Sequence, residues 1–205
     1  MLKIYGNRNS GNVNKVEYTV IILGLEYEYQ EMDFQKDLKT EWYLKIHPAG
    51  KVPAIDDNGF VLFESGAICK YLCDKKGSDL YPKDLKHRAI IEQWIDFSVQ
   101  HVGTAMGKVA FNRLFAPMMG VPVDENSLKE GMQLLERFLP LVDKQLGKSK
   151  FLASDKMTLA DLSLFGVLEY AEKAQYDLSM YKSLSAWRNK LMATEFYRKV
   201  HKKWQ

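Results

Sequence analysis

Three short segments of the chain carry side chains whose types and spacing could do chemistry. They are Asn9–Asn12, Lys51–Ala54 and Phe63–Gly66, and each stands at the start or the end of an expected strand or helix. Ser65 would open a helix, where a hydroxyl, unpaired backbone N–H groups and the positive end of the helix dipole together favour a carboxylate. Taken alone, Ser65 is more simply interpreted as a helix cap. The three segments form one candidate site if the fold brings them together.

The elements around these segments predict such a fold. Apolar residues recur at helical spacing over residues 13–23. The short apolar or alternating runs that are typical of strands are 2–5, 25–29, 52–55 and 60–63. Asn58-Gly59, between the last two runs, is a strong hairpin signal. With a short helix over 40–46 and another from Glu64, the order βαβ, short helix, ββα is the pattern of a thioredoxin-like α/β domain. In such a sheet the three segments meet at one end, around a groove.

A polar stretch separates this part of the chain from a remainder with helical periodicity. Residues 77–83 contain Gly77 and Pro82 and predict a linker. We therefore expect a thioredoxin-like domain at 1–76 and an all-helical domain at 84–205.

Two local signals refine the helical part. Its first long helix is expected to end before Pro117, because proline lacks the N–H that continues a helix. Thr158–Asp161 has the spacing of a capping box, with Asp in the place of the usual Glu. Asp161 is therefore expected to be structural and not a catalytic acid.

Composition excludes several classes of protein. The chain has 205 residues, and its longest apolar stretch, Val20–Leu25, is far too short to span a membrane. The net charge of +3 is mild, with Lys and Arg scattered among acidic residues, so nucleic acid is not expected as a partner. Cys69 and Cys73 are predicted to be reduced thiols on one helix face, and the N-terminus lacks the features of a secretory signal. These features favour a cytoplasmic protein.

Familiar catalytic motifs are missing from the sequence. The four histidines are widely spread without metal-ligand spacing. Gly147-Lys148-Ser149 ends like a phosphate loop, but Val142 stands where the leading glycine belongs. No Gly-x-Ser-x-Gly or Gly-x-Gly-x-x-Gly sequence is present in the expected context. A hydrolase, a metalloenzyme and a nucleotide cofactor all lack support.

Several motifs, in order along almost the whole chain, resemble the cytosolic glutathione transferases, most nearly their phi class. Those quoted for the first domain are Tyr5-Gly6 with Ser10, Tyr43-Leu44 to Pro48, Gly50 to Pro53, Phe63 to Ser65, Ala67-Ile68 and Tyr71-Leu72. Those for the second are Ala110-Phe111, Leu114-Phe115, Phe151 to Asp155 and Thr158 to Leu162. The resemblance implies a thioredoxin-like domain followed by a helical one, glutathione as co-substrate without a further cofactor or metal, a role in detoxification, and a homodimer.

The resemblance also assigns roles to the residues that bind glutathione. Ser65 would meet the γ-glutamyl carboxylate, and Glu64 the ammonium group beside it. Val52 would present its backbone N–H and C=O to the cysteinyl peptide like an added strand. The family implies that Pro53 follows a cis peptide bond.

The catalytic assignment rests on Ser10. By resemblance its hydroxyl would donate to the sulfur of glutathione and stabilise the thiolate, whereas the simpler alternative is that Ser10 only caps the first helix. Lys39 and Lys51 could neutralise the glycyl carboxylate. Ser10-Gly11-Asn12 also resembles the Thr-Pro-Asn arrangement of the nu class, in which the asparagine approaches the sulfur.

The second substrate is expected to be a small hydrophobic electrophile. By analogy with the family it would bind between the domains, near residues that could equally be helix-packing core. These are Arg8, Met106, Phe111, Phe115 and Met118. Three functions stay open: conjugation of glutathione to such electrophiles, a glutathione-dependent peroxidase or disulfide reductase that also uses Asn12, and a non-catalytic ligand-binding or interaction protein.

Overall fold

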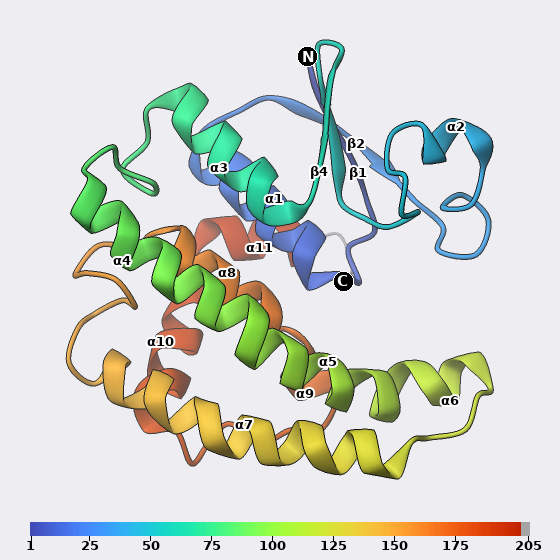
Figure 1. Ribbon diagram of the computed structural model, residues 1–205. Coiled ribbons are helices and arrows are strands. Elements are labelled where there is room, and N and C mark those ends of the chain that lie inside the picture. The colour runs from blue at the N-terminus through green and yellow to red at the C-terminus, as the bar shows by residue number, and fades with distance from the viewer. Residues whose placement is uncertain (202–205) are drawn as a thin grey trace. The chain divides into compact units, whose positions relative to one another are not determined.

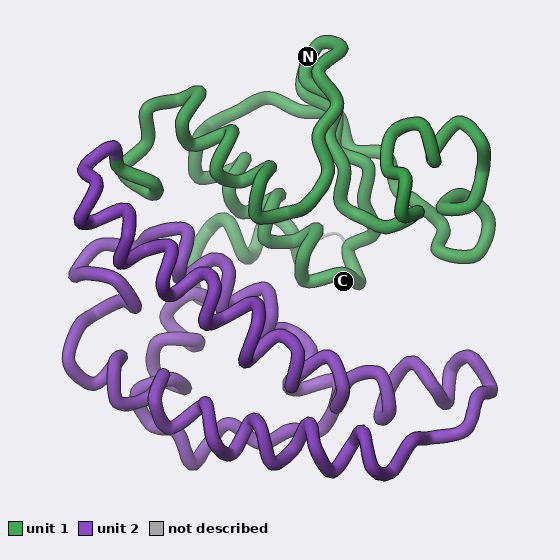
Figure 2. Tube along the Cα trace, viewed as in Figure 1, with its two compact units in different colours: residues 1–82, 194–205 green, residues 83–193 purple. Residues whose placement is uncertain are grey.

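The computed structural model describes residues 1–201, and its elements are drawn in Figure 1. The chain divides into two compact units (Figure 2). The first comprises Met1–Pro82 and the segment that begins at Thr194, and the second comprises Lys83–Ala193. Within the described residues no helix is long and apolar enough to cross a membrane.

A four-stranded mixed sheet forms the centre of the first unit. Its strands are β1 (Leu2–Gly6), β2 (Tyr27–Glu31), β3 (Ala54–Asp57) and β4 (Phe60–Phe63), in the spatial order β2-β1-β3-β4. β1 pairs parallel with β2, whereas β3 is antiparallel to both β1 and β4. The β3–β4 turn places Asn58 at φ 56° and Gly59 at φ 92°, the left-handed pair that an Asn-Gly hairpin favours. The predicted hairpin and thioredoxin-like fold are confirmed.

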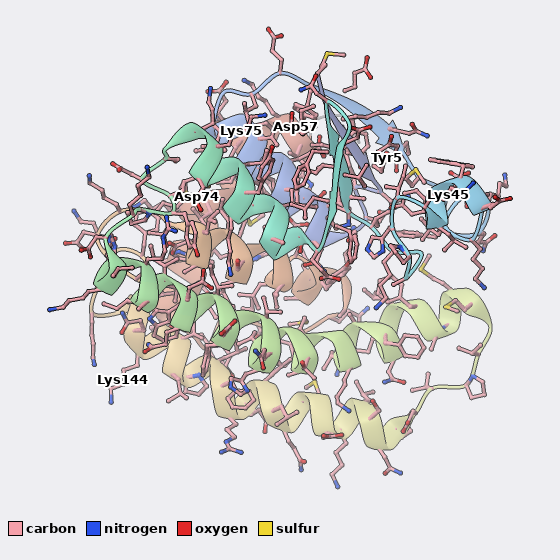
Figure 3. The ribbon with its side chains drawn as sticks, turned by 45° about the horizontal axis from the view of Figure 1, so that its top comes forward. Tyr5, Lys45, Asp57, Asp74, Lys75 and Lys144 are labelled. Atoms are coloured by element: carbon pink, nitrogen blue, oxygen red, sulfur yellow. The ribbon has the colours of Figure 1, made fainter. Side chains whose placement is uncertain are left out.

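Three helices accompany this sheet within residues 1–82 of the first unit. They are α1 (Gly11–Ile22), the short α2 (Glu41–Leu44) and α3 (Ser65–Lys76), with α1 and α3 in direct contact (Figure 1). Cys69 and Cys73 are buried free thiols on α3, as predicted. α3 is tied to the sheet where Lys75 pairs with the carboxylate of Asp57 at the end of β3 (Figure 3).

The C-terminal helix α11 (Glu195–His201) belongs to the first unit. The ring of Tyr18 in α1 lies 5.2 Å from that of Phe196, and the Tyr18 hydroxyl is 2.7 Å from Nε2 of His201. The sequence predicts a helical domain over residues 84–205, whereas the segment from Thr194 belongs to the first unit. The contacts of α11 with α1, those of Tyr18 among them, place it in the first unit; residues 202–205 lie outside the described chain.

The second unit opens with an unbroken helical run. Its parts are α4 (Leu85–Asp96), the π-helical η1 (Phe97–Gly103), α5 (Thr104–Ala110), the π-helical η2 (Phe111–Phe115) and α6 (Ala116–Met119). The prediction that this helix ends before Pro117 is wrong. Pro117 lies in the first turn of α6, directly after the wider turns of η2, where a missing N–H is tolerated. The run ends instead at Gly120, which has φ 65°.

Four further helices complete the second unit. They are α7 (Glu125–Leu146), α8 (Leu159–Leu168), α9 (Tyr170–Lys173) and α10 (Lys182–Met192). α7 packs closely on α5 at Gly131, where an added Cβ would lie 2.9 Å from the carbonyl oxygen of Ala105.

The capping box at the start of α8 is confirmed. Oδ2 of Asp161 accepts hydrogen bonds from the backbone N–H and the hydroxyl of Thr158, at 2.9 and 3.1 Å. Oδ1 accepts from the Leu152 N–H at 3.0 Å and from the Trp187 indole at 3.1 Å. Asp161 is fully buried, and both of its carboxylate oxygens accept hydrogen bonds from the protein itself. This supports the structural role predicted for Asp161.

Candidate functional site

Ser10 is the N-cap residue of α1, but its hydroxyl is not used as a cap. Its backbone has φ −95° and ψ 116°, and its carbonyl accepts from the N–H groups of Val13 and Asn14, each at 3.0 Å. Within residues 1–201 the Ser10 side chain makes no capping hydrogen bond, and the residue is 8% exposed. The alternative that Ser10 merely caps the helix is therefore not supported. The hydroxyl can serve a bound molecule.

A hydrogen bond joins the N-terminal ends of α1 and α3. The hydroxyl of Ser65, the first residue of α3, donates to Oδ1 of Asn12 in the first turn of α1 over 3.3 Å. The first N–H groups of a helix lack intrahelical partners and carry its positive dipole end. Two such ends beside each other favour a ligand with negative charge.

The turn before β3 presents backbone groups beside these helix ends. The Val52–Pro53 peptide bond is cis, as the resemblance implied. The hydroxyl of Tyr43 donates to the carbonyl of Lys51 over 2.6 Å and so anchors the turn to α2. Neither the N–H nor the C=O of Val52 is hydrogen-bonded within the described part of the chain. This edge can accept an extended peptide.

Glu64 occupies a strained position between β4 and α3. It is the N-cap of α3 with φ 70° and ψ 108°, a conformation that non-glycine residues adopt only at a cost of about 1–3 kcal/mol. Its side chain is exposed. Strain of this kind is concentrated at ligand-binding sites, where it aims a side chain at its ligand.

Lys39 and Lys51 are both exposed at the surface of this unit. Neither ammonium group has an ion-pair partner among residues 1–201. Lys51 is next to Val52 in the turn before β3, whereas no contact links Lys39 to the other predicted residues in the described chain.

Comparison with known proteins assigns the chain to a family. The family model "Glutathione S-transferase, N-terminal domain" matches residues 1–74, and "Glutathione S-transferase, C-terminal domain" matches residues 105–195. The chain belongs to the glutathione S-transferase family. A probable glutathione S-transferase, GSTF2, from Oryza sativa subsp. japonica is 34% identical, over 97% of this chain and 95% of the relative. Glutathione S-transferase F10 from Arabidopsis thaliana is 32% identical, over 91% and 90%.

Solved structures agree with this assignment to the glutathione S-transferases. Glutathione transferase F2 from Populus trichocarpa superposes with a TM-score of 0.91 at 33% identity, covering 99% of this chain and 98% of the other. A glutathione S-transferase-I bound with lactoylglutathione superposes with a TM-score of 0.88 at 30% identity, covering 97% of both chains. The chain is thus a member of an enzyme family.

Arg8, predicted near the electrophile, is held inside the first unit of this glutathione S-transferase. Its Nη2 and Nε donate to the two carboxylate oxygens of Glu17 at 2.9 and 3.0 Å, and its guanidinium lies 3.8 Å from the ring centre of Tyr29. The hydroxyl of Tyr27 donates to the same carboxylate over 2.8 Å. The ion pair is enclosed, with 10% of the Arg8 side chain exposed and 1% of that of Glu17. Sequence reasoning missed this cluster.

The other residues predicted for the electrophile lie in the second unit in different environments. Met106 is buried, with 1% exposure, and Phe115 is half-buried with its ring 5.8 Å from that of Tyr170. Phe111 and Met118 are exposed, at 43% and 82%. Phe111 and Met118 therefore offer accessible apolar surface on η2 and α6, whereas Met106 is in the core.

Sequence reasoning also missed two residues that brace the turn before β3. Tyr43 is fully buried and holds the Lys51 carbonyl, and His47 is 2% exposed. Both lie in the Tyr43–Pro48 stretch that carries the family resemblance. That stretch was the available signal, and it did not indicate which side chains point inward.

Proposed function

We propose that this glutathione S-transferase ionises the thiol of glutathione through a hydrogen bond from Ser10 and conjugates it to small hydrophobic electrophiles. The observation that carries the proposal is the Ser10 hydroxyl, which stands at the N-terminus of α1 and is left uncommitted by the helix. Asn12, two residues on, is joined to Ser65 at the start of α3.

The energies are sufficient for this chemistry. A free thiol with a pKa of about 8.5 is only about 3% ionised at pH 7. Lowering that pKa by about two units takes about 2.7 kcal/mol. A hydrogen bond to a charged group contributes about 1.5–3 kcal/mol, and the dipole of α1 adds to it. Ser10 would therefore donate to the sulfur and would not itself be a nucleophile.

Recognition of glutathione would use the two ends of the tripeptide. Ser65 and the N-terminus of α3 would hold the γ-glutamyl carboxylate, and Glu64 its ammonium group. The free backbone groups of Val52, before Pro53, would pair with the cysteinyl peptide. The exposed lysines Lys39 and Lys51 would meet the glycyl carboxylate.

The electrophile is proposed from chemistry alone. Phe111, Phe115 and Met118 are large, adaptable apolar side chains that suit varied hydrophobic molecules. Arg8 and Met106 are weaker candidates, because the first is committed to Glu17 and the second is in the core.

We further propose that the protein is a phi-class homodimer in the cytoplasm. β4 is an edge strand of the sheet, yet Phe60, Val61 and Phe63 on it are 50%, 39% and 39% exposed. Exposed apolar side chains on an edge strand are typical of a protein–protein interface. The family relationship favours a second copy of this chain as the partner. The two buried free thiols suit a reducing compartment. A monomer by light scattering would contradict the homodimer.

A glutathione-dependent peroxidase or disulfide reductase is the second candidate. It is favoured by the exposed Asn12, whose side-chain N–H groups remain available beside the Ser65 contact. A peroxide and a small disulfide tested as substrates beside the electrophile would distinguish the two reactions.

The deciding experiment is conjugation of glutathione to an activated aryl chloride. We expect kcat/KM to fall about 10- to 100-fold in Ser10→Ala, which is the loss of a hydrogen bond to a thiolate. Affinity for S-methylglutathione should be largely kept. A wild-type rate in Ser10→Ala would reject the role of Ser10, and tight binding without conjugation would favour the second candidate or a non-catalytic ligand-binding protein.

A further inference from the structure

His47 is a buried titratable residue to which the proposed mechanism gives no role. It follows α2 and is 2% exposed. Its ring centre lies 4.7 Å from that of Phe63 and 6.5 Å from that of Tyr43. The imidazole therefore sits against aromatic rings from two different parts of the first unit.

These contacts join the two segments proposed to bind glutathione. The His47 N–H donates to the Tyr43 carbonyl, and the His47 carbonyl accepts from the Gly50 N–H, both over 2.8 Å. That second bond closes the turn that leads into Lys51 and Val52. On the other side of the ring, Phe63 immediately precedes Glu64. A shift of the His47 ring would displace the turn and the start of α3 relative to each other.

The surroundings of the His47 ring favour a neutral imidazole. Nδ1 of His47 is enclosed and has no hydrogen-bond partner in the described part of the chain. With its proton on Nε2 the neutral ring leaves only a lone pair at Nδ1, whereas the protonated ring would bury an unpaired N–H there.

The charged groups that face His47 are Glu64 and Lys51. Burial lowers the pKa of His47 below its ordinary value, and this effect outweighs the opposing influence of Glu64 and of the residue's own backbone carbonyl; Lys51 lowers the pKa further. His47 is therefore neutral at pH 7, and its protonation at lower pH opposes the folded arrangement of the ring.

We propose that neutral His47 is a positioning residue that holds the turn 47–53 against Phe63, so that protonation of His47 weakens the binding of glutathione. The proposal rests on the proposed function, because Val52 and Glu64 affect affinity only if glutathione binds there.

S-methylglutathione is the probe that isolates this effect. It has no thiol to ionise, and its carboxylates and amine keep their charges between about pH 5 and pH 7.5. We expect its Kd, measured by calorimetry, to rise about tenfold with the wild-type protein as the pH falls from about 7.5 to about 5. In His47→Asn, which has an uncharged polar side chain at all these pH values, the Kd should change less than about twofold. His101→Asn, which removes an exposed histidine in the second unit, should keep the wild-type profile.

Circular dichroism at each pH verifies that the proteins stay folded, and His47→Gln replaces His47→Asn if the latter does not fold. A Kd that is constant with pH in the wild type, or an unchanged pH step in the folded variant, would overturn the proposal. No binding of S-methylglutathione at any pH would instead reject the proposed function on which it rests.

Discussion

The hydroxyl of Ser65 donates to Oδ1 of Asn12 across 3.3 Å, and this bond joins residues that are 53 positions apart in the chain. It places the first residue of α3 beside the first turn of α1. Ser65 is buried whereas Asn12 is exposed, so the bond lies at the rim of the unit. The Ser65 hydroxyl has a single proton, so donating to a ligand carboxylate would replace its bond to Asn12, whereas its two lone pairs stay able to accept.

Substitutions of this pair should separate stability from binding. We expect Ser65→Ala and Asn12→Ala each to cost about 0.5–1.5 kcal/mol of unfolding free energy, and their double variant to cost less than the sum. Affinity for S-methylglutathione should fall further in Ser65→Ala, because Ser65 alone would contact the carboxylate. Urea unfolding and calorimetry measure the two effects, with Ser179→Ala in the second unit as control. Equal losses of affinity in both variants would contradict the separate role of Ser65.

The role of Ser10 predicts a shift in the ionisation of bound glutathione. In Ser10→Ala the pKa of the bound thiol should rise by about one to two units, because the hydrogen bond to the thiolate is lost. The ultraviolet absorbance of the thiolate, followed against pH in the binary complex, measures this shift directly.

Asn12→Ala is the matched comparison, since Asn12 lies on the same helix end. We expect it to change the thiol pKa by less than about 0.5 unit if Ser10 alone stabilises the sulfur. An equal shift in the two variants would show that Asn12 shares this role, as the peroxidase or reductase alternative requires.

What the sequence predicted well was local. Asn58-Gly59 has a backbone preference of its own, and Thr158 with Asp161 forms a box within one helical turn, so neither depends on distant residues. Ser10 and Ser65 became candidates because each stands where a strand or a loop meets a helix. In the structure the Ser10 hydroxyl makes no capping hydrogen bond, whereas the Ser65 hydroxyl donates to Asn12.

The features that the sequence did not predict depend on contacts between distant segments, or on a local rule that does not hold here. Tyr18 packs on Phe196 across 178 positions, and this contact places α11 with the first unit. Pro117 was expected to end a helix, but the π-helical turns before it remove the need for its N–H. The inward direction of His47 depends on the ring of Phe63, which is 16 residues away.

The enclosed pair of Arg8 and Glu17 should be important for stability. Glu17→Gln would remove the enclosed counter-charge of a guanidinium that is 10% exposed, at an expected cost of about 3–5 kcal/mol. The exposed pair of Lys45 (Figure 3) and Glu41 offers a matched control, and Lys45→Ala should cost less than about 1 kcal/mol. Urea unfolding compares the two variants. Similar small costs would mean that the Arg8 pair is dispensable, which would restore Arg8 as a candidate for substrate contact.

The pair of Asp57 and Lys75 predicts a dependence of stability on pH. The ammonium of Lys75, and then the hydroxyl of Tyr71 at 2.7 Å, hold the pKa of Asp57 below its ordinary value. The resulting stabilisation is fully present above the unfolded-state pKa of about 3.9 and is lost as the pH falls through the lower pKa of the folded state. In Asp57→Asn this carboxylate is missing, so the stability difference from the wild type should shrink steadily below about pH 4. Urea unfolding at a series of pH values measures the difference, and a value that stays constant to about pH 2 would show that Asp57 does not stabilise the fold through its charge.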